Sequence, residues 1–517
     1  MEYPFQPNAL YYGDCLPVLR RWPDGCVDLI YLDPPFNSKQ DYNVLFASVE
    51  NRAPESGGGG GSGLKNGRSR NGQPTNGRTQ VKAYQDTWFW NAEAQQRVAE
   101  LTRVSTAVGD CFRGLQHILG ESGMLAYLSY MAQRLIELRR VLKDSGSLYL
   151  HCDPTAGHYL KIVLDAVFGV KNFRNEIVWC YTGPSNTKRW FPRKHDTIFL
   201  YVKNEKQKVG EGKNNKPIYQ LPTFNRDDVR IPYKSESFTM GGSGSLARKN
   251  KPGTDYLTGA EEQLAKGKIA EDFWVDIRPL SVSKERVGTP TQKPLALLRR
   301  IIQASSNPGD IVLDPFVGSG TTAVAAAQLN RRFAGIDLAS FMLDIVQRRL
   351  EGHPVATFGV PQHFGDAKRL VAENPFAFEK WAIERIPGLL ANQVQVGDGG
   401  IDGVGRVAFP LEQAPSNLVL AQVKGGQFRP NDLRAFRGVM ASEEAALGIF
   451  ITLRKVEGQQ RRNAERELAG FGSLQQGAAK FPRLQLWSIE EYYDARLPML
   501  PTLAHPFTGR PLEGPLI

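Results

Sequence analysis

Asp33, Pro34, Pro35 and Phe36 bring a carboxylate, two prolines and an aromatic ring together in one short segment. The prolines stiffen the backbone and carry no N–H donor, so the Pro34 carbonyl is left to accept a hydrogen bond. A carboxylate beside a fixed carbonyl suits a planar amino group, which has two hydrogens to donate. Phe36 would offer a stacking face to a base turned out of its helix. A strand-ending turn with a buried phenylalanine is the alternative for these four residues alone.

A second segment, DPFVGSGTT from Asp314 to Thr322, has the glycines that a closely bound cofactor needs. Gly318 and Gly320 have no Cβ to obstruct a ligand, and a helix that begins near Thr321 would aim amide N–H groups at it. Asp337 follows the next apolar run, where an acid commonly bonds ribose hydroxyls. The spacing is shorter than GxGxxG and lacks the Walker lysine, which disfavours a dinucleotide or a triphosphate. A structural turn is the alternative.

Both segments follow short apolar runs, so each is expected at the end of a buried strand. The expected strands are 27–32, 147–151, 177–181, 197–202, 310–315 and 333–338, and the expected helices are 124–143 and 321–330. Asp144-Ser145-Gly146 is expected to end the first helix. Alternating strands and helices predict an α/β fold with a doubly wound, Rossmann-like, mostly parallel sheet. Because ligands of such sheets bind at the carboxyl ends of the strands, Asp33 and Gly318 should lie side by side.

The order of these motifs resembles that of the amino-methylating DNA methyltransferases of the beta arrangement, in which DPPY/F precedes FxGxG. Gly13-Asp14, Thr291-Gln292-Lys293-Pro294 and Arg193-Lys194-His195-Asp196 match further segments of that family. The resemblance covers roughly residues 10–350. Phe36 stands where the family usually has tyrosine, which keeps the stacking face and removes the hydroxyl.

The resemblance implies a site for S-adenosylmethionine next to a site for a base. The implied cofactor-binding residues are Asp14, Lys293, Asp314, Phe316, Gly318, Ser319, Gly320, Thr321 and Asp337. Asp14 would contact the adenine ring of the cofactor, Asp337 would hold the ribose, and Lys293 would close over it. The implied catalytic residues are Asp33, Pro34, Pro35 and Phe36.

The implied reaction is direct methyl transfer to an exocyclic amine, with no metal and no covalent intermediate. Hydrogen bonds to Asp33 and to the Pro34 carbonyl would favour a pyramidal nitrogen that presents its lone pair. No Pro-Cys motif is present, which argues against methylation of cytosine C5, a reaction that needs a thiolate. Adenine N6 is the expected acceptor, because enzymes that act on cytosine N4 more often have serine in place of Asp33. Cytosine N4 remains the alternative.

Length and charge suit a multidomain protein that acts on nucleic acid. The chain has 517 residues and a formal charge of +11, and double-stranded DNA is the expected partner. Residues 1–365 are expected to form the methyltransferase domain, with a flexible basic loop at 51–82. Residues 204–290, rich in lysine and aromatic side chains, are the expected target-recognition region; a solvated insertion is the alternative for either segment.

Residues 366–517 are expected to form a second, smaller α/β domain that is like a restriction endonuclease. Asp402 lies in a glycine-rich turn, and Gln422 and Lys424 end the apolar run that follows it. This pattern resembles the Mrr-like nucleases, with Glu379, or alternatively Glu384, as the helix glutamate. The resemblance implies a Mg²⁺ site at Glu379, Asp402 and Gln422, with Lys424 as the catalytic partner. A degenerate module that only binds DNA is the alternative to an endonuclease.

The five cysteines form no CxxC pair, and no apolar run is long enough to span a membrane. These features predict a protein of the reducing cytoplasm. A fusion of methyltransferase and nuclease-like domains suggests restriction-modification or defence. An RNA or protein-glutamine methyltransferase, and a non-catalytic DNA-binding protein with a vestigial cofactor fold, are the competing hypotheses. The oligomeric state stays open, with a homodimer among the alternatives.

Overall fold

The structure is a computed structural model, and its described residues form two compact units, one ending at Val360 and the other beginning at Pro361. The described residues are 3–35, 88–104, 106–183, 187–211, 216–233, 238–240, 246–248, 265–280, 285–289, 291–392, 400–506 and 509–512. Phe36 and the expected basic loop at 51–82 lie outside them, as do several parts of 204–290.

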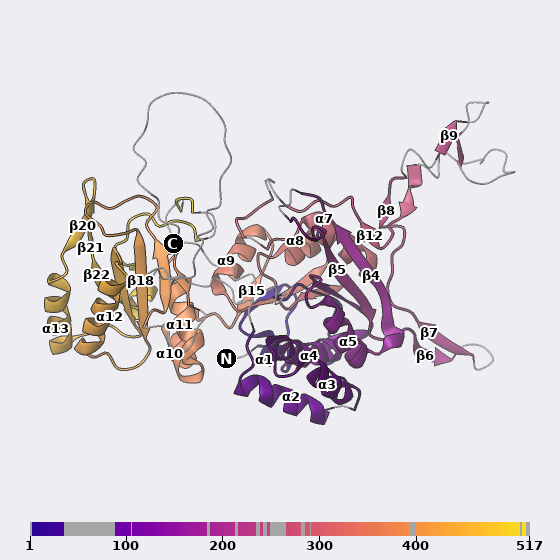
Figure 1. The fold of residues 1–517 in the computed structure, drawn as a ribbon, viewed down its shortest axis with the longest axis horizontal. Coiled ribbons are helices and arrows are strands. Elements are labelled where there is room, and N and C mark those ends of the chain that lie inside the picture. The colour runs from indigo at the N-terminus through magenta and orange to yellow at the C-terminus, as the bar shows by residue number, and fades with distance from the viewer. Residues whose placement is uncertain are drawn as a thin grey trace. The chain divides into compact units, whose positions relative to one another are not determined.

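The first unit is built on a sheet with the strand order β12-β4-β5-β3-β2-β13-β14-β1-β15 among the described residues (Figure 1). The strands are β1 (Ala9–Tyr12), β2 (Val27–Leu32), β3 (Leu142–Cys152), β4 (Phe173–Cys180), β5 (His195–Val202), β12 (Phe273–Trp274), β13 (Ile311–Asp314), β14 (Arg332–Asp337) and β15 (Ala356–Phe358). Neighbouring strands are parallel except where β5 pairs with β3 and with β4. The predicted doubly wound, mostly parallel sheet is therefore confirmed.

Helices cover both faces of this sheet, as Figure 1 shows, with α1 to α5 on one face and α7 to α9 on the other. They are α1 (Cys15–Leu19), α2 (Ala92–Val104), α3 (Thr106–Leu119), α4 (Gly123–Val141), α5 (Gly157–Phe168), α7 (Leu295–Ser305), α8 (Thr321–Gln328) and α9 (Ser340–Arg349). A short 3₁₀ turn (Val170–Asn172) follows α5.

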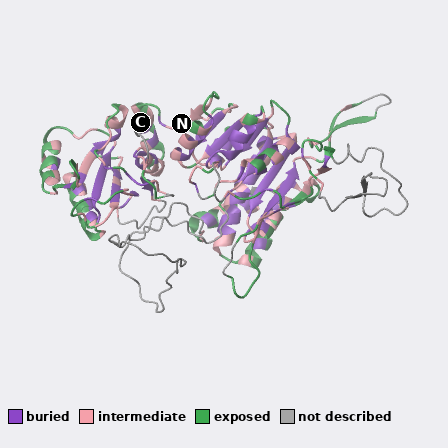
Figure 2. Cartoon of the chain, turned by 90° about the horizontal axis from the view of Figure 1, so that it is seen from above, coloured by how far each residue is buried: buried purple, intermediate pink, exposed green. Residues whose placement is uncertain are grey.

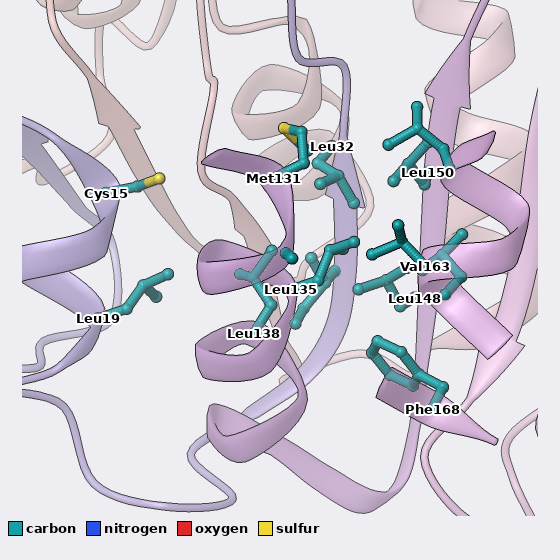
Figure 3. Packing of buried hydrophobic residues seen from close by; sticks show 14 of the residues in the cluster. Cys15, Leu19, Leu32, Met131, Leu135, Leu138, Leu148, Leu150, Val163 and Phe168 are labelled. Atoms are coloured by element: carbon teal, nitrogen blue, oxygen red, sulfur yellow. The ribbon is translucent and has the colours of Figure 1, made fainter. Parts of the chain in front are cut away.

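Alternation along the strands decides which face each side chain reaches. Leu148 and Leu150 of β3 pack with Met131 and Leu135 of α4 in one hydrophobic core (Figure 3). The intervening Tyr149 points to the other face, where its hydroxyl lies 2.7 Å from Ser305 Oγ of α7. Successive strand residues point to opposite faces, so Tyr31, which pairs with Tyr149, also lies on the α7 side.

The strand that ends at Leu32 and the strand that ends at Asp314 are direct neighbours. β2 and β13 run parallel, with Leu29 paired to Val312 and Ile30 paired to Leu313. Asp28 reinforces the contact, because its Oδ2 accepts the amide of Ile311 at 2.9 Å. The carboxyl ends of the two strands therefore open on the same edge of the sheet.

α4 ends at Val141, shortly before Asp144-Ser145-Gly146, the residues expected to end it, and these three residues lie inside β3. β3 begins at Leu142, directly after α4, and its register with β2 shifts between Val27 and Leu29. These residues form a bulge in the strand instead. A Cβ at Gly146 would lie 2.7 Å from the Asp28 carbonyl oxygen, so the close approach of the two strands requires glycine here.

The partly described region 204–290 contributes short strand pairs besides β12. They are β6 (Gln207–Glu211) with β7 (Pro217–Gln220), β8 (Arg230–Ile231) with β11 (Lys268–Ile269), and β9 (Phe238–Met240) with β10 (Leu246–Arg248). Tyr219 and Phe224 are half-exposed, so aromatic side chains are accessible in this region.

The second unit is a smaller α/β domain, as predicted, with a sheet in the order β16-β17-β18-β19-β22 among its described residues. Its strands are β16 (Leu390–Ala391), β17 (Gly403–Arg406), β18 (Leu418–Lys424), β19 (Leu447–Thr452), β20 (Ser473–Gln476), β21 (Ala479–Pro482) and β22 (Leu484–Ser488). Its helices are α10 (Phe364–Glu373), α11 (Pro375–Glu384), α12 (Pro430–Ser442), α13 (Gly458–Ala469) and α14 (Ile489–Tyr493). In Figure 2 the buried residues of both units concentrate in their sheets.

All five cysteines are free thiols. None of the helices that the structure describes is long and apolar enough to cross a membrane.

Candidate active site at the carboxyl edge of the sheet

Asp33 lies directly after β2, and its two carboxylate oxygens have different surroundings. Oδ2 forms an ion pair with the ammonium group of Lys293. Oδ1 is buried and has no hydrogen-bond partner among the described residues. A buried acceptor without a donor is unfavourable in a finished structure, so it marks the place where a donor from outside would bind. Pro34 next to it is buried, whereas Pro35 is exposed.

Lys293 is held in place by the segment that precedes α7. The side chain of Gln292 accepts the amide of Val287 and donates to the carbonyl of Glu285, both at 2.8 Å. The Glu285 carboxylate accepts the amide of Leu295 at 2.6 Å, which satisfies a donor in the first turn of α7. The TQKP segment is thus a fixed support that presents Lys293 to Asp33.

The glycine-rich loop between β13 and α8 is closed by Asp337 at the end of β14. One oxygen of Asp337 accepts the amide of Gly318 at 2.8 Å, and the other accepts the amide of Ala339 at 2.9 Å. Gly318 has a φ of +48°, and a Cβ there would meet nothing nearer than the Phe316 carbonyl oxygen at 3.9 Å. The loop therefore has an open face at Gly318, which fits the close approach of a ligand.

Gly320 has a different reason to be glycine. Its φ is +81°, and a Cβ would lie 2.6 Å from a methyl group of Val346 on α9. This glycine allows α8 and α9 to pack closely, so its role is in the packing of the helices that hold the loop. The sequence alone could not separate the roles of Gly318 and Gly320.

Three acids share this edge of the sheet. Burial raises the pKa of Asp314 to about 7, and the nearby charges of Asp33 and Asp337 act in the same direction. Burial also raises the pKa of Asp337 to about 6. Asp314 accepts hydrogen bonds from the amide of Phe316 and, at 2.5 Å, from the hydroxyl of Thr322. Clustered carboxyl groups give the edge a negative potential, which fits a ligand with a positive centre such as a sulfonium.

Asp14 lies after β1, next to the Asp337 strand. It caps α1 by accepting the amide of Leu16 at 2.9 Å, and it forms a 2.5 Å ion pair with Arg134 of α4. The guanidinium group of Arg134 is buried and lies over the ring of Tyr130. Asp14 is therefore oriented by a structural partner, and about a third of its side chain is exposed.

Sequence reasoning missed a buried hydrogen-bonded chain beside Asp33. The hydroxyl of Tyr31 lies 2.9 Å from His151 Nδ1, and His151 Nε2 lies 3.0 Å from the Asp196 carboxylate. Tyr181 donates to the other oxygen of Asp196 at 3.1 Å. Burial acts to raise the pKa of Asp196, but the hydrogen bond from His151 and the charge of Lys293 bring it below its usual value. In the sequence, His151 stands at the end of an expected strand and Asp196 in a segment that matches the family, but neither position indicated that the two side chains would meet.

Comparison with known proteins assigns the family of the first unit. Residues 27–348 match the N6/N4 methylase family model, described as DNA methylase. This chain belongs to the N6/N4 DNA methylase family.

Among individual relatives, this chain is 32% identical over 226 residues to the type II methyltransferase M.HpaI of Haemophilus parainfluenzae, a match of 44% of this chain and 60% of that protein. It is 30% identical over 245 residues to the DNA adenine methyltransferase YhdJ of Escherichia coli K12, a match of 47% of this chain and 72% of YhdJ. The chain thus spans about three fifths to three quarters of the length of these two relatives.

Solved structures also align with part of this chain. PvuII DNA methyltransferase, which is cytosine-N4-specific, covers 68% of this chain and 96% of its own, with 12% identity and a TM-score of 0.35. The M1.HpyAVI–SAM complex covers 66% of this chain and 98% of its own, with 16% identity and a TM-score of 0.32.

The second unit is similar to a family other than the one expected. Residues 377–473 are similar to the model of NACHT-associated inactive restriction endonuclease 1, and the Mrr-like assignment is not confirmed. Among the residues that the structure describes, no group of three or more His, Cys, Asp or Glu side chains could hold a metal ion. Neither observation supports the expected Mg²⁺ site.

The structure places the predicted nuclease residues on β18, on α11 and in the turn before β17. Asp402 Oδ2 accepts the amide of Val423 at 2.7 Å, which ties the turn before β17 to β18. Gln422 and Lys424 share one face of β18, and Lys424 Nζ lies 3.7 Å from a carboxylate oxygen of Asp432. Glu379 and the competing Glu384 both lie on α11, five residues apart in sequence.

Proposed function

We propose that this chain transfers a methyl group from S-adenosylmethionine to adenine N6 in double-stranded DNA. The observation that carries the proposal is the buried Asp33 Oδ1, which has no hydrogen-bond partner in the described part of the chain. It stands at the sheet edge that also holds the open face of Gly318. An acceptor for an amine next to a fitting cofactor loop is the arrangement that amino-group methylation requires.

Each residue would act through a contact of its own. Asp33 Oδ1 and the Pro34 carbonyl would accept the two hydrogens of the target amine and orient its lone pair. Lys293 would hold Asp33 through Oδ2, so that the carboxylate cannot rotate away from the amine. When bound, S-adenosylmethionine would supply the electrophilic methyl group. We assign its binding to the Gly318 loop, including Asp314, Phe316, Ser319, Gly320 and Thr321, and to Asp14, Lys293 and Asp337.

Pro35 and Phe36 complete the proposed catalytic segment. Pro35 would stiffen the backbone after Asp33, and Phe36 would stack on the flipped base. Adenine is preferred over cytosine N4 because a carboxylate stands at position 33, and because the relative YhdJ is described as a DNA adenine methyltransferase. Cytosine N4 is the alternative product.

We further assign residues 1–365 to the methyltransferase domain and 204–290 to target recognition. The division of the chain after Val360 supports the first boundary. We assign 366–517 to a DNA-binding module that does not cleave, since its family is described as inactive and Lys424 lies near Asp432. Such a fusion suits restriction-modification or another form of DNA defence.

The test compares the wild-type chain with Asp33→Asn on DNA from cells that lack it. The variant keeps the shape of the side chain and loses the charge that accepts the amine, so we expect a fall in methyl transfer of roughly 100-fold or more. Calorimetry should show that S-adenosylmethionine still binds, and Asp110→Asn on the exposed face of α3 should leave transfer unchanged.

Mass spectrometry of the product nucleosides identifies the acceptor. N6-methyladenine supports the proposal, and N4-methylcytosine without N6-methyladenine would replace adenine by cytosine. No transfer to any DNA by a wild-type chain that binds S-adenosylmethionine would end the proposal.

A further inference from the structure

The most exposed large apolar side chains that the structure describes are two adjacent rings, Trp190 and Phe191. They are 82% and 97% exposed, and the next most exposed large apolar side chains in the described residues reach 70%. Isolated apolar residues on a surface need no explanation, but two neighbouring aromatic rings almost fully in water do. Neither ring contributes to the packing of the unit or to the site described above.

These rings lie between β4 and β5, at the same edge of the sheet as Asp33. The strand pair closes with Cys180 opposite His195, and the amide of Tyr181 donates to the Lys194 carbonyl at 2.9 Å beyond it. β5 runs antiparallel to β3, so its first residues stand beside the carboxyl ends of β3 and β2. The described parts of this connection, 182–183 and 187–194, therefore leave the sheet next to the amine-accepting loop.

The base of this connection is fixed to the site. Asp196, one residue after the pair that closes the strands, is hydrogen-bonded to His151, which contacts Tyr31 two residues before Asp33. The charge of Lys293 acts on the same carboxylate. Hydrogen bonds therefore join the base of the connection to β2, the strand that leads into Asp33.

The charge of the connection identifies its partner. Lys188, Arg189 and Arg193 are exposed and flank the two rings, and the sequence from 182 to 195 contains no acidic residue. Cations fit the phosphates on either side of a base step, while aromatic rings stack on bases. Cations and apolar wedges occur together where proteins insert into a duplex and unstack it.

We infer that Trp190 and Phe191 enter duplex DNA beside the target base and stack in the space that the base leaves when it turns into the Asp33 site. This inference rests on the proposed function. Stacking offsets the loss of base stacking and pairing, which base flipping otherwise leaves uncompensated. Lys188, Arg189 and Arg193 would hold the neighbouring phosphates.

The test uses the full chain and two versions of one short duplex that carries a sequence found methylated in cells expressing it. In the second version an abasic site stands opposite the target base, which is therefore already unpaired. For the variant Trp190→Ala with Phe191→Ala we expect kcat/KM to fall roughly tenfold or more on the paired duplex and to recover most of that loss on the second. Ile118→Ala, which truncates a 70% exposed side chain on α3, should change neither value. An equal loss on both duplexes, or no loss on the paired one, overturns the inference.

A binding measurement tests the insertion of Trp190 independently of whether the chain transfers methyl groups. Stacking on bases should quench Trp190 emission when sheared genomic DNA is added, and subtracting the signal of Trp190→Phe isolates that emission. Quenching without methyl transfer would support insertion while the proposed function fails. Absence of any Trp190 quenching by DNA that the chain binds would refute insertion, whether or not transfer occurs.

Discussion

Asp314 and Asp337 are carboxyl groups with raised pKa values at an edge proposed to receive a cation. Their pKa values are about 7 and about 6, so at pH 5 both are largely protonated and at pH 8 both are ionised. The sulfonium of S-adenosylmethionine is favoured by the ionised forms. We therefore expect its affinity to rise between pH 5 and 8, and S-adenosylhomocysteine, a neutral thioether, to respond less. Calorimetry across this range measures both, and a flat profile for S-adenosylmethionine would contradict the expectation.

In the absence of ligand, the same two groups also determine whether the free energy of unfolding rises or falls with pH. Their pKa values in the folded state exceed the value of about 3.9 for an unfolded aspartate, so the folded state binds these protons more tightly. Their contribution to the free energy of unfolding is therefore present at low pH and is lost as pH rises from about 4 to about 7. Asp314→Asn should flatten this part of a thermal unfolding profile.

Single residues were predictable from the sequence where a motif marks them. The positions of Asp33 and Gly318 at the carboxyl edge of the sheet could be predicted because the prolines and glycines around them form recognisable motifs. The buried chain of Tyr31, His151 and Asp196 could not be, since it joins residues up to 165 positions apart through strand pairing. Nothing in the local sequence of His151 tells which face of β3 it will occupy or what it will meet there.

At the scale of elements, two glycines in one loop should respond differently to the same change. Gly320→Ala places a Cβ 2.6 Å from Val346 in addition to a left-handed φ, so we expect a loss of about 2 to 4 kcal/mol in the free energy of unfolding. Gly318→Ala has the strained φ alone, so its loss should be about 1 to 2 kcal/mol, with a larger effect on S-adenosylmethionine binding. Denaturant titration and calorimetry on each variant test this contrast.

Gly114→Ala is the matched control for that comparison. Gly114 lies inside α3, and a Cβ there would meet nothing within 4 Å, so alanine should stabilise the chain slightly. Equal losses for Gly318→Ala and Gly320→Ala would mean that contact with α9 is unimportant.

Most strands of the main sheet follow from apolar runs in the sequence, but its edges do not. β12 has two residues and β15 has three, and strands this short show no recognisable alternation of apolar residues in the sequence. The order of the strands was also beyond reach, because β1 pairs with β14 and β15 from the far end of the unit. The sequence did not predict that Asp144-Ser145-Gly146 would form a bulge inside β3, because glycine is common both after helices and in bulges, and only the approach of Asp28 distinguishes the two.

At the scale of the whole molecule, the second unit should not cut DNA. With Mg²⁺ and unmethylated DNA, we expect the wild-type chain to leave both strands intact, because its family is described as inactive and no described acidic cluster fits a metal. Lys424→Ala should give the same gel pattern as wild type. Cleavage by wild type that Lys424→Ala abolishes would restore the endonuclease hypothesis.

The parallel pairing of β2 with β13 joins residues 283 positions apart. During translation, β2 leaves the ribosome roughly 15 to 60 seconds before the strand that will lie beside it, at ordinary rates of elongation. Throughout that interval the nascent chain holds an apolar strand with one unsatisfied side, which is exposed to aggregation unless something shields it. The edge that carries Asp33 and Gly318 must therefore be among the last parts of the first unit to assemble, and a chain stalled before Ile311 would contain Asp33 without the glycine-rich loop beside it.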